Sequence, residues 1–209
     1  RGNSVEAIRG LVTGVLEGRV RLHFFADGPQ REIAGTRIAG ELPREATGSP
    51  HVGVYLNDAG PTKMQFYLRY DASLVARSCV DGVQRLAGSL ELTNDGTDDL
   101  PPNVTGEGYP GLRVQPGEQL LVIYLTTPVG GTLESLSIEG QRVPHPVVQR
   151  LAGRDVATIA LRVGPQQEQS IDFEIRSGPG QEGDIAFDVS PGASPGGASG
   201  TIPSSCRVR

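Results

Sequence analysis

Short runs of alternating apolar and polar residues, separated by turn residues about every ten positions, fill this chain from about residue 51 onward. The alternation is clearest at 89–93, 157–163 and 170–176, where one set of side chains is apolar and the other is polar. This period of two is typical of strands with one buried face. No helical pattern long enough for a parallel crossover lies between two of these runs. We therefore expect a mainly β (α+β) fold, an antiparallel β-sandwich that is immunoglobulin-like in general architecture.

Glycine and proline mark the boundaries of the expected strands, since 29 Gly and 16 Pro are present among 209 residues. Turns are predicted at Asp81–Gly82, Pro116–Gly117, Gly130–Gly131 and Glu139–Gly140. The run 119–125 is apolar on both faces, which predicts a central strand. The strands are expected near residues 52–57, 63–77, 83–94, 112–115, 119–126, 132–138, 142–150, 156–163, 169–176, 184–189 and 203–208.

The first 48 residues predict a different, helix-strand-helix element. Asn3 and Glu6 have capping-box spacing, and apolar residues then recur at helical intervals up to Gly18. Residues 19–26 alternate like a strand, and a second helix is expected between Asp27 and Gly40. This element either packs on the sandwich or ends an upstream domain. The expected divisions are 1–48, a sandwich over 50–189, a Pro/Gly/Ser-rich linker over 190–202, and a tethered terminal strand over 203–209.

The two cysteines, Cys79 and Cys206, have no spacing typical of a zinc or redox motif. They could be two buried thiols in a cytosolic protein. We favour a disulfide, because Cys206 follows a Pro/Gly/Ser-rich segment that would fray without a covalent tie. A disulfide implies an oxidising, extracytoplasmic compartment.

Charge and hydropathy exclude some partners. The net charge is -5, and the arginines are scattered, so no basic stripe exists to contact nucleic acid. No apolar run is long enough to span a bilayer, and the chain begins with Arg1 rather than Met. We expect any membrane anchor to lie in an upstream region.

Four segments resemble the C-terminal part of a family of exported, membrane-anchored envelope proteins of GC-rich Gram-positive bacteria, a domain-of-unknown-function family. They are Gly53–Asp58 with Gly60–Met64 and Tyr67–Asp71; Leu90–Asn94 with Leu100–Gly106; the opening element with Asp27–Gln30; and Pro116–Glu118 with Tyr124 and Gly130. Pro61 departs from the family's pattern. The resemblance implies an envelope location and an association with surface-polysaccharide genes, and it implies no known activity.

No cofactor, metal or catalytic motif stands out. His23, His51 and His145 are unpaired in sequence, and no nucleophile elbow is present. Asn94, Asp95, Asp98 and Asp99 crowd one loop and could supply calcium ligands, but they lack the EF-hand pattern. A solvated turn is the better interpretation.

The chain's only lysine, Lys63, lies shortly after Asn57 and Asp58. We expect an Asp58–Lys63 salt bridge across the turn. Two alternatives give these residues a role: an amide crosslink from a buried Lys63 to an asparagine, or a recognition site.

The function favoured by the sequence is an extracytoplasmic, non-catalytic structural or interaction module of an anchored envelope protein. Its partner would be a surface glycan or an envelope protein. The competing hypotheses are a glycan-acting enzyme or accessory domain in polysaccharide assembly, and adhesion by strand addition. Only ten Phe and Tyr residues (five of each) and no Trp are available for an aromatic sugar platform.

Overall fold

A computed structural model describes residues 3–44, 46–60, 62–97, 99–107, 111, 114–193 and 199–206. The chain divides into two compact units, Arg1–Pro43 and Arg44–Arg209. No helix in the described ranges is both long enough and apolar enough to cross a membrane.

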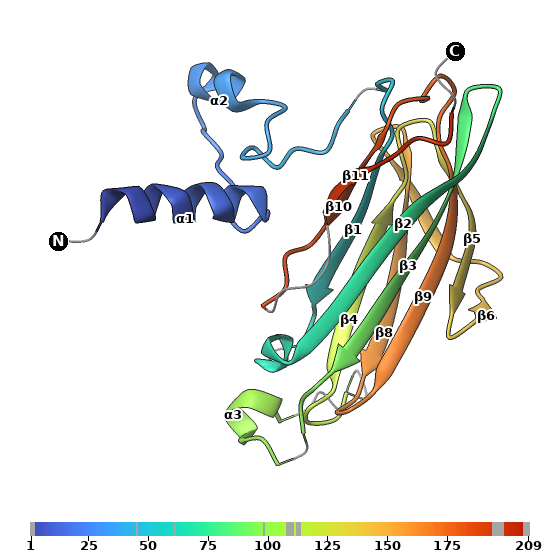
Figure 1. Cartoon of the computed structure of the whole chain (residues 1–209). Helices are drawn as coiled ribbons and strands as arrows, with labels where there is room; N and C mark the ends of the chain where they lie inside the picture. Colours follow the sequence, from blue (N-terminus) through green and yellow to red (C-terminus); the bar gives the residue numbers. More distant parts are fainter. Residues whose placement is uncertain are drawn as a thin grey trace. The chain divides into compact units, whose positions relative to one another are not determined.

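The larger unit is a β-sandwich of two sheets, which confirms the predicted fold class (Figure 1). Sheet A has the order β11-β10-β1-β4-β8-β7, and sheet B has the order β2-β3-β9-β5-β6. The strands of sheet A are β1 (His51–Asp58), β4 (Gln119–Thr126), β7 (Val147–Leu151), β8 (Arg154–Val163), β10 (Ile185–Val189) and β11 (Gly200–Ile202). Those of sheet B are β2 (Leu68–Val80), β3 (Val83–Asn94), β5 (Thr132–Ile138), β6 (Gln141–Arg142) and β9 (Glu168–Arg176).

The core lies between the inner faces of the two sheets, where alternate residues of each strand are buried. Sheet A contributes side chains such as Val54 and Ile123, and sheet B contributes Leu90 and Phe173, all at most 2% exposed. Burying a side chain of this size contributes about 1.5 to 3 kcal/mol. Gln119–Thr126 lies in the interior of sheet A, between β1 and β8, as the predicted central strand.

One strand pair differs from the antiparallel expectation. β1 and β10 pair in parallel, with Val52 opposite Phe187, whereas the other strand pairs in the described residues are antiparallel. The antiparallel expectation assumed that two parallel strands are joined by a helix. Here the chain forms the other strands of the sandwich between β1 and β10, so no connecting helix is needed.

The predicted turns are present. Asp81 and Gly82 both have positive φ (51° and 71°), as do Glu139 and Gly140 (50° and 68°), which is the backbone of a tight hairpin. Turns also form at Gly117 (φ 81°) and Gly130 (φ 78°), where glycine adopts the left-handed conformation without strain.

The strand predicted over 142–150 is two strands, β6 and β7. Pro144 and Pro146 lie between them and cannot donate to a ladder. A further tight turn at Ala152–Gly153 joins β7 to β8, and the sequence analysis did not anticipate it.

One other expected strand starts later than predicted. The strand expected from residue 63 begins at Leu68, because Met64–Phe66 form a short 3-10 helix whose Met64 is fully buried. For the strand expected over 112–115, residues 112 and 113 lie outside the described residues. A short helix, α3 (Pro102–Thr105), precedes it.

The terminal strand was predicted one segment too late. It is β11, Gly200–Ile202, at the end of the predicted linker, and it pairs with β10. Residues 203–206 form no strand, because Pro203 has no N–H and the two serines after it bond to a side chain of β3. Residues 194–198 and 207–209 lie outside the described residues.

Among its described residues, the smaller unit contains two helices and no strand. α1 (Ser4–Leu16) begins after Asn3, whose side chain accepts a hydrogen bond from Val5 N at 3.2 Å. α2 spans Asp27–Ile33. The predicted strand over 19–26 is wrong. After the turn that follows α1, this segment makes one backbone hydrogen bond to a distant residue, Leu22 N to Ile38 O at 2.8 Å, and it pairs with no strand among the described residues. No residue of α1 is buried, so its apolar face is exposed.

Candidate functional site

The outer face of sheet B carries a shallow groove of about 660 Å³ that reaches across all its strands. We call it the sheet B groove. Its polar lining includes Ser73, Ser89, Ser135, Ser137, Asp172 and Arg142. The groove therefore combines a hollow with several outward polar groups.

The strand alternation places these polar side chains outward. On β9, Ile171 and Phe173 are buried, whereas Asp172 and Glu174 between and after them are exposed. On β5, a bulge between Leu133 and Ser135 shifts the register against β9. Bulges bend and twist a strand, so this one contributes to the curvature of the groove wall.

Gly88 forms part of the groove floor. A Cβ atom at this position would lie 2.3 Å from Phe173 Cζ and 2.9 Å from the Ser73 carbonyl oxygen. Gly88 therefore lets the Phe173 ring lie directly against β3, which closes the core beneath the groove. The sequence gives no sign that Gly88 lies this close to Phe173.

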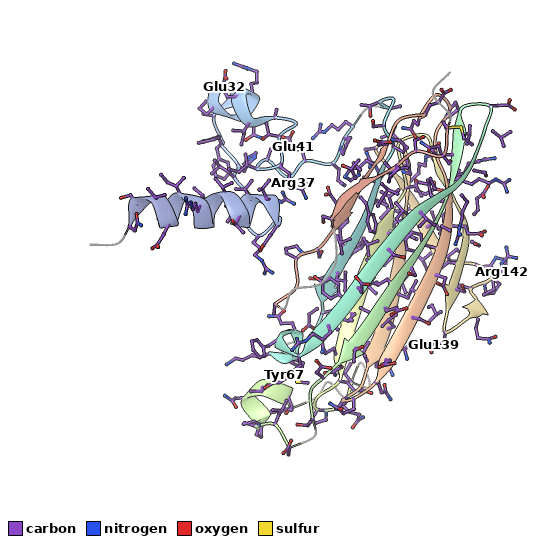
Figure 2. The ribbon with its side chains drawn as sticks, viewed as in Figure 1. Glu32, Arg37, Glu41, Tyr67, Glu139 and Arg142 are labelled. Atoms are coloured by element: carbon purple, nitrogen blue, oxygen red, sulfur yellow. A yellow bond between two sulfur atoms is a disulfide. The ribbon has the colours of Figure 1, made fainter. Side chains whose placement is uncertain are left out.

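The β5–β6 hairpin forms one wall and is fixed to the sheet. Glu139 Oε1 accepts hydrogen bonds from the backbone N–H of Ser170 and from its hydroxyl, the latter at 3.1 Å. Figure 2 shows Arg142 at this edge of the sandwich and Glu139 at the end of the same hairpin. The wall is thus held by a turn residue that reaches across to β9.

Some polar groups in the groove satisfy one another, and others do not. The hydroxyls of Ser73 and Ser89 are 2.9 Å apart, and Ser135 Oγ donates to Glu174 Oε2 at 3.0 Å. Within the described residues, the side chains of Asp172, Ser137 and Arg142 have no hydrogen-bond or ion-pair partner. These three groups are available to a ligand.

Asn57, Asp58 and Lys63, the site predicted from the sequence, lie at the end of β1 and after it. Asn57 and Lys63 are exposed, and Asp58 is half-buried. The Asp58 Oδ1 atom accepts a hydrogen bond from Gly60 N at 2.9 Å, and burial raises the pKa of the Asp58 carboxyl, partly offset by this bond.

The structure does not form the expected Asp58–Lys63 salt bridge within its described residues. The exposed Lys63 also lacks the burial that an amide crosslink needs to activate its amine. Its backbone N–H instead donates to Val104 O at 2.9 Å, so this segment is held through the main chain. Pro61, between the two residues, lies outside the described residues.

Asn94 is structural rather than a ligand. It is fully buried, its Nδ2 donates to Gly117 O (3.1 Å) and Val163 O (3.0 Å), and its Oδ1 accepts from Gly96 N (3.0 Å). Asp95 instead pairs with Arg69 at 3.1 Å. Asp98 lies outside the described residues. Among the described side chains, no group of three His, Cys, Asp or Glu could hold a metal ion.

The predicted disulfide between Cys79 and Cys206 is present, with a Cα–Cα distance of 4.9 Å. It joins the end of β2 to the segment after β11 and spans a sequence separation of 127. The C-terminal segment is therefore covalently part of the sandwich.

Gln84, opposite Cys79 in the β2–β3 hairpin, reinforces this tie. It is fully buried, and its Nε2 donates to the carbonyl oxygens of Gln181 and Gly183, both at 2.8 Å. Its Oε1 accepts from the hydroxyl of Ser204 and from the N–H of Ser205, both at 3.0 Å. The sequence analysis missed Gln84, because a lone glutamine in a strand gives no signal of such a role.

Sheet A holds a His–Asp contact and a buried arginine that the sequence did not reveal. His51 Nε2 lies 2.9 Å from Asp188 Oδ2. Arg154 is only 1% exposed, and burial lowers the pKa of its guanidinium, an effect partly opposed by Tyr55. Arginine stays charged at neutral pH despite such a shift.

Comparisons of the chain with protein-family models, with curated proteins and with solved structures find no match. Hydroxyl, carboxylate and guanidinium groups in an open hollow can bind a polar ligand. The hydrogen bonds of the described residues pair no groove serine with a histidine that could act as its base.

Proposed function

We propose that this chain is an extracytoplasmic, non-catalytic interaction module of an anchored cell-envelope protein, and that the sheet B groove is its contact surface. The observation that carries the proposal is the groove itself, which spans every strand of sheet B and leaves Asp172, Ser137 and Arg142 without partners among the described residues. Ligand sites are generally concave and carry a small number of polar groups that fix the orientation of the ligand.

The Cys79–Cys206 disulfide supports the extracytoplasmic location. Structural disulfides persist in oxidising compartments and are rare where thiols are kept reduced. This bond fixes a Pro/Gly/Ser-rich C-terminal segment, so it serves the fold rather than a redox reaction. The resemblance to exported envelope proteins points the same way.

The alternative of a glycan-acting enzyme has one observation in its favour. Asp172 and Glu174 project from the same face of β9, two residues apart, and two such positions are separated by about 7 Å along a strand. Paired carboxylates of inverting glycosidases have a comparable separation. However, both side chains are exposed, and a catalytic acid needs burial to hold its proton at neutral pH. Binding is therefore the better supported role.

The chain's single lysine allows a direct test of location. Lys63 is exposed, so a membrane-impermeant amine-reactive ester should modify it in intact cells that produce the full-length protein. Mass spectrometry of the purified protein then reads the modification of the Lys63 peptide. A Lys63→Arg variant controls for assignment. Modification only after cell lysis would overturn the proposed location.

A further inference from the structure

One line of polar residues crosses the sheet B groove in register. Ser73 lies opposite Ser89, Ser89 opposite Asp172, Asp172 opposite Ser137, and Ser137 opposite Arg142. We call these five residues the polar row. Each comes from a different strand, and each lines the groove.

The polar row has a defined length and direction. Neighbouring strands lie about 4.8 Å apart, so four such steps give a row of about 19 Å that runs perpendicular to the strands. A ligand that follows the row must therefore be extended and must present a polar group at every step. This is the repeat pattern of a linear oligosaccharide chain.

The free groups of the row suit hydroxyl ligands. Asp172 stands at the centre with both carboxylate oxygens available, and a carboxylate can accept hydrogen bonds from two adjacent hydroxyls. Ser137 next to it can both donate and accept, and Arg142 at the end donates only. Hydrogen bonds to charged groups are the stronger kind, so Asp172 and Arg142 should contribute most of the affinity.

Two aliphatic side chains lie beside the row on β2 and β3. Val75 is opposite Ala87 in the next register line, and Val75 is 42% exposed. Sugar rings carry C–H groups on their faces and hydroxyls on their edges. At this end of the row, an apolar pair next to polar groups fits both parts of such a ring without an aromatic platform.

The charges around the row disfavour an anionic ligand. Glu134 and Glu174 lie in the groove near Asp172, against the two arginines Arg77 and Arg142. On the other side of the row, Asp71 and Glu91 are directly opposite each other on β2 and β3 and face outward. Arg85 and Arg176 are also exposed on this face, opposite each other, and Glu134 pairs with Arg176 at 3.9 Å. Acidic and basic groups therefore nearly balance, so the surface has no net positive charge to attract a polyanion.

We propose that the polar row binds a linear, uncharged oligosaccharide that lies across the strands of sheet B, with Asp172 as its central contact. This inference rests on the proposed function, because it names the ligand class of the same groove. A protein partner would instead use the groove without the repeat of hydroxyl contacts.

The test uses the purified, disulfide-intact chain on an array of neutral and anionic glycans, followed by calorimetry with the bound glycan cut to increasing lengths. We expect binding to neutral linear glycans, with Kd falling until the oligosaccharide spans about 19 Å and constant beyond that length. Raising salt from low to physiological strength should change Kd less than twofold, since no net ion pairing is involved.

Matched variants locate the site. Asp172→Ala should raise Kd at least tenfold, and Ser137→Ala about threefold to tenfold. Glu91→Ala removes an exposed carboxylate from the same face outside the groove lining and should leave Kd within twofold. Circular dichroism of each variant checks that the fold is retained.

Three results would overturn the inference: no neutral glycan bound on the array, preferential binding of anionic glycans, or equal effects of Asp172→Ala and Glu91→Ala. The two proposals fail separately. If Lys63 is labelled in intact cells but no glycan on the array is bound, only the ligand class is refuted. If Lys63 is not labelled in intact cells but the purified chain binds a glycan, only the location is refuted.

Discussion

Removing the disulfide should destabilise the whole sandwich, although the bond lies near the C-terminus. Cys79 ends β2 and Cys206 follows β11, so the bond closes a loop that contains β3 through β11, with a sequence separation of 127. In the loop-entropy model, closing a loop of this length lowers the entropy of the unfolded chain by an amount worth about 5 kcal/mol at 25 °C. Residual structure in the unfolded chain reduces this figure, so we expect a loss of about 3 to 5 kcal/mol.

The double variant Cys79→Ser/Cys206→Ser tests this value by urea denaturation, compared with the oxidised chain under the same conditions. For a domain of this size, 1 kcal/mol corresponds to about 2 to 4 °C in Tm, so Tm should fall by roughly 6 to 20 °C. The oxidised chain treated with reductant and alkylated should match the double variant. A loss below about 1 kcal/mol in both samples would refute the reasoning, because the loop would then add little to the stability of the fold.

Three further predictions concern single side chains. Gln84→Ala should lower the free energy of unfolding by about 2 to 3 kcal/mol, because the substitution leaves two buried carbonyl groups without a donor. Urea denaturation measures this loss, and the control Gln149→Ala on the exposed β7 should show no comparable loss. Gly88→Ala should cost about 1 to 3 kcal/mol through its clash with Phe173, and adding Phe173→Leu should recover part of that loss; equal stability of Gly88→Ala and the wild type would contradict the close approach. Burial raises the folded-state pKa of Asp58 above its unfolded value of 3.8. Ionisation of Asp58 therefore lowers the stability of the fold at a pH above the folded-state pKa, and it has no effect at a pH below 3.8. Asp58→Asn keeps the Oδ1 acceptor for Gly60 N, so it should be more stable than the wild type at neutral pH and equally stable in acid; a stability difference that is constant across the pH range would contradict this.

Local signals predicted most of the sandwich. Strand alternation and the turn pairs at Asp81–Gly82 and Glu139–Gly140 each follow from neighbours in sequence, and the structure has them. The failures needed information from distant residues. The segment 19–26 alternates like a strand but has no partner strand, and β1 pairs in parallel with a strand more than a hundred residues later.

The candidate site was harder to predict for the same reason. The polar row combines residues from five strands, and their register decides that Ser89 lies opposite Asp172 and Asp172 opposite Ser137. A serine on the outer face of a strand has no distinctive sequence context. Lys63 drew attention because it is the chain's only lysine, yet it lies exposed and unpaired with Asp58 in the described structure. The Cys79–Cys206 disulfide could be predicted in full, because the chain has two cysteines and they allow one pairing.

The most direct test of the claim that the sheet B groove is the contact surface is chemical-shift mapping of the disulfide-intact chain. Its backbone amides would be followed by NMR during titration with soluble wall polysaccharide from cells that produce the full-length protein. We predict that the largest shifts fall on Ser73, Ser89, Ser137 and Asp172 of sheet B. Shifts confined to the outer face of sheet A would contradict this claim.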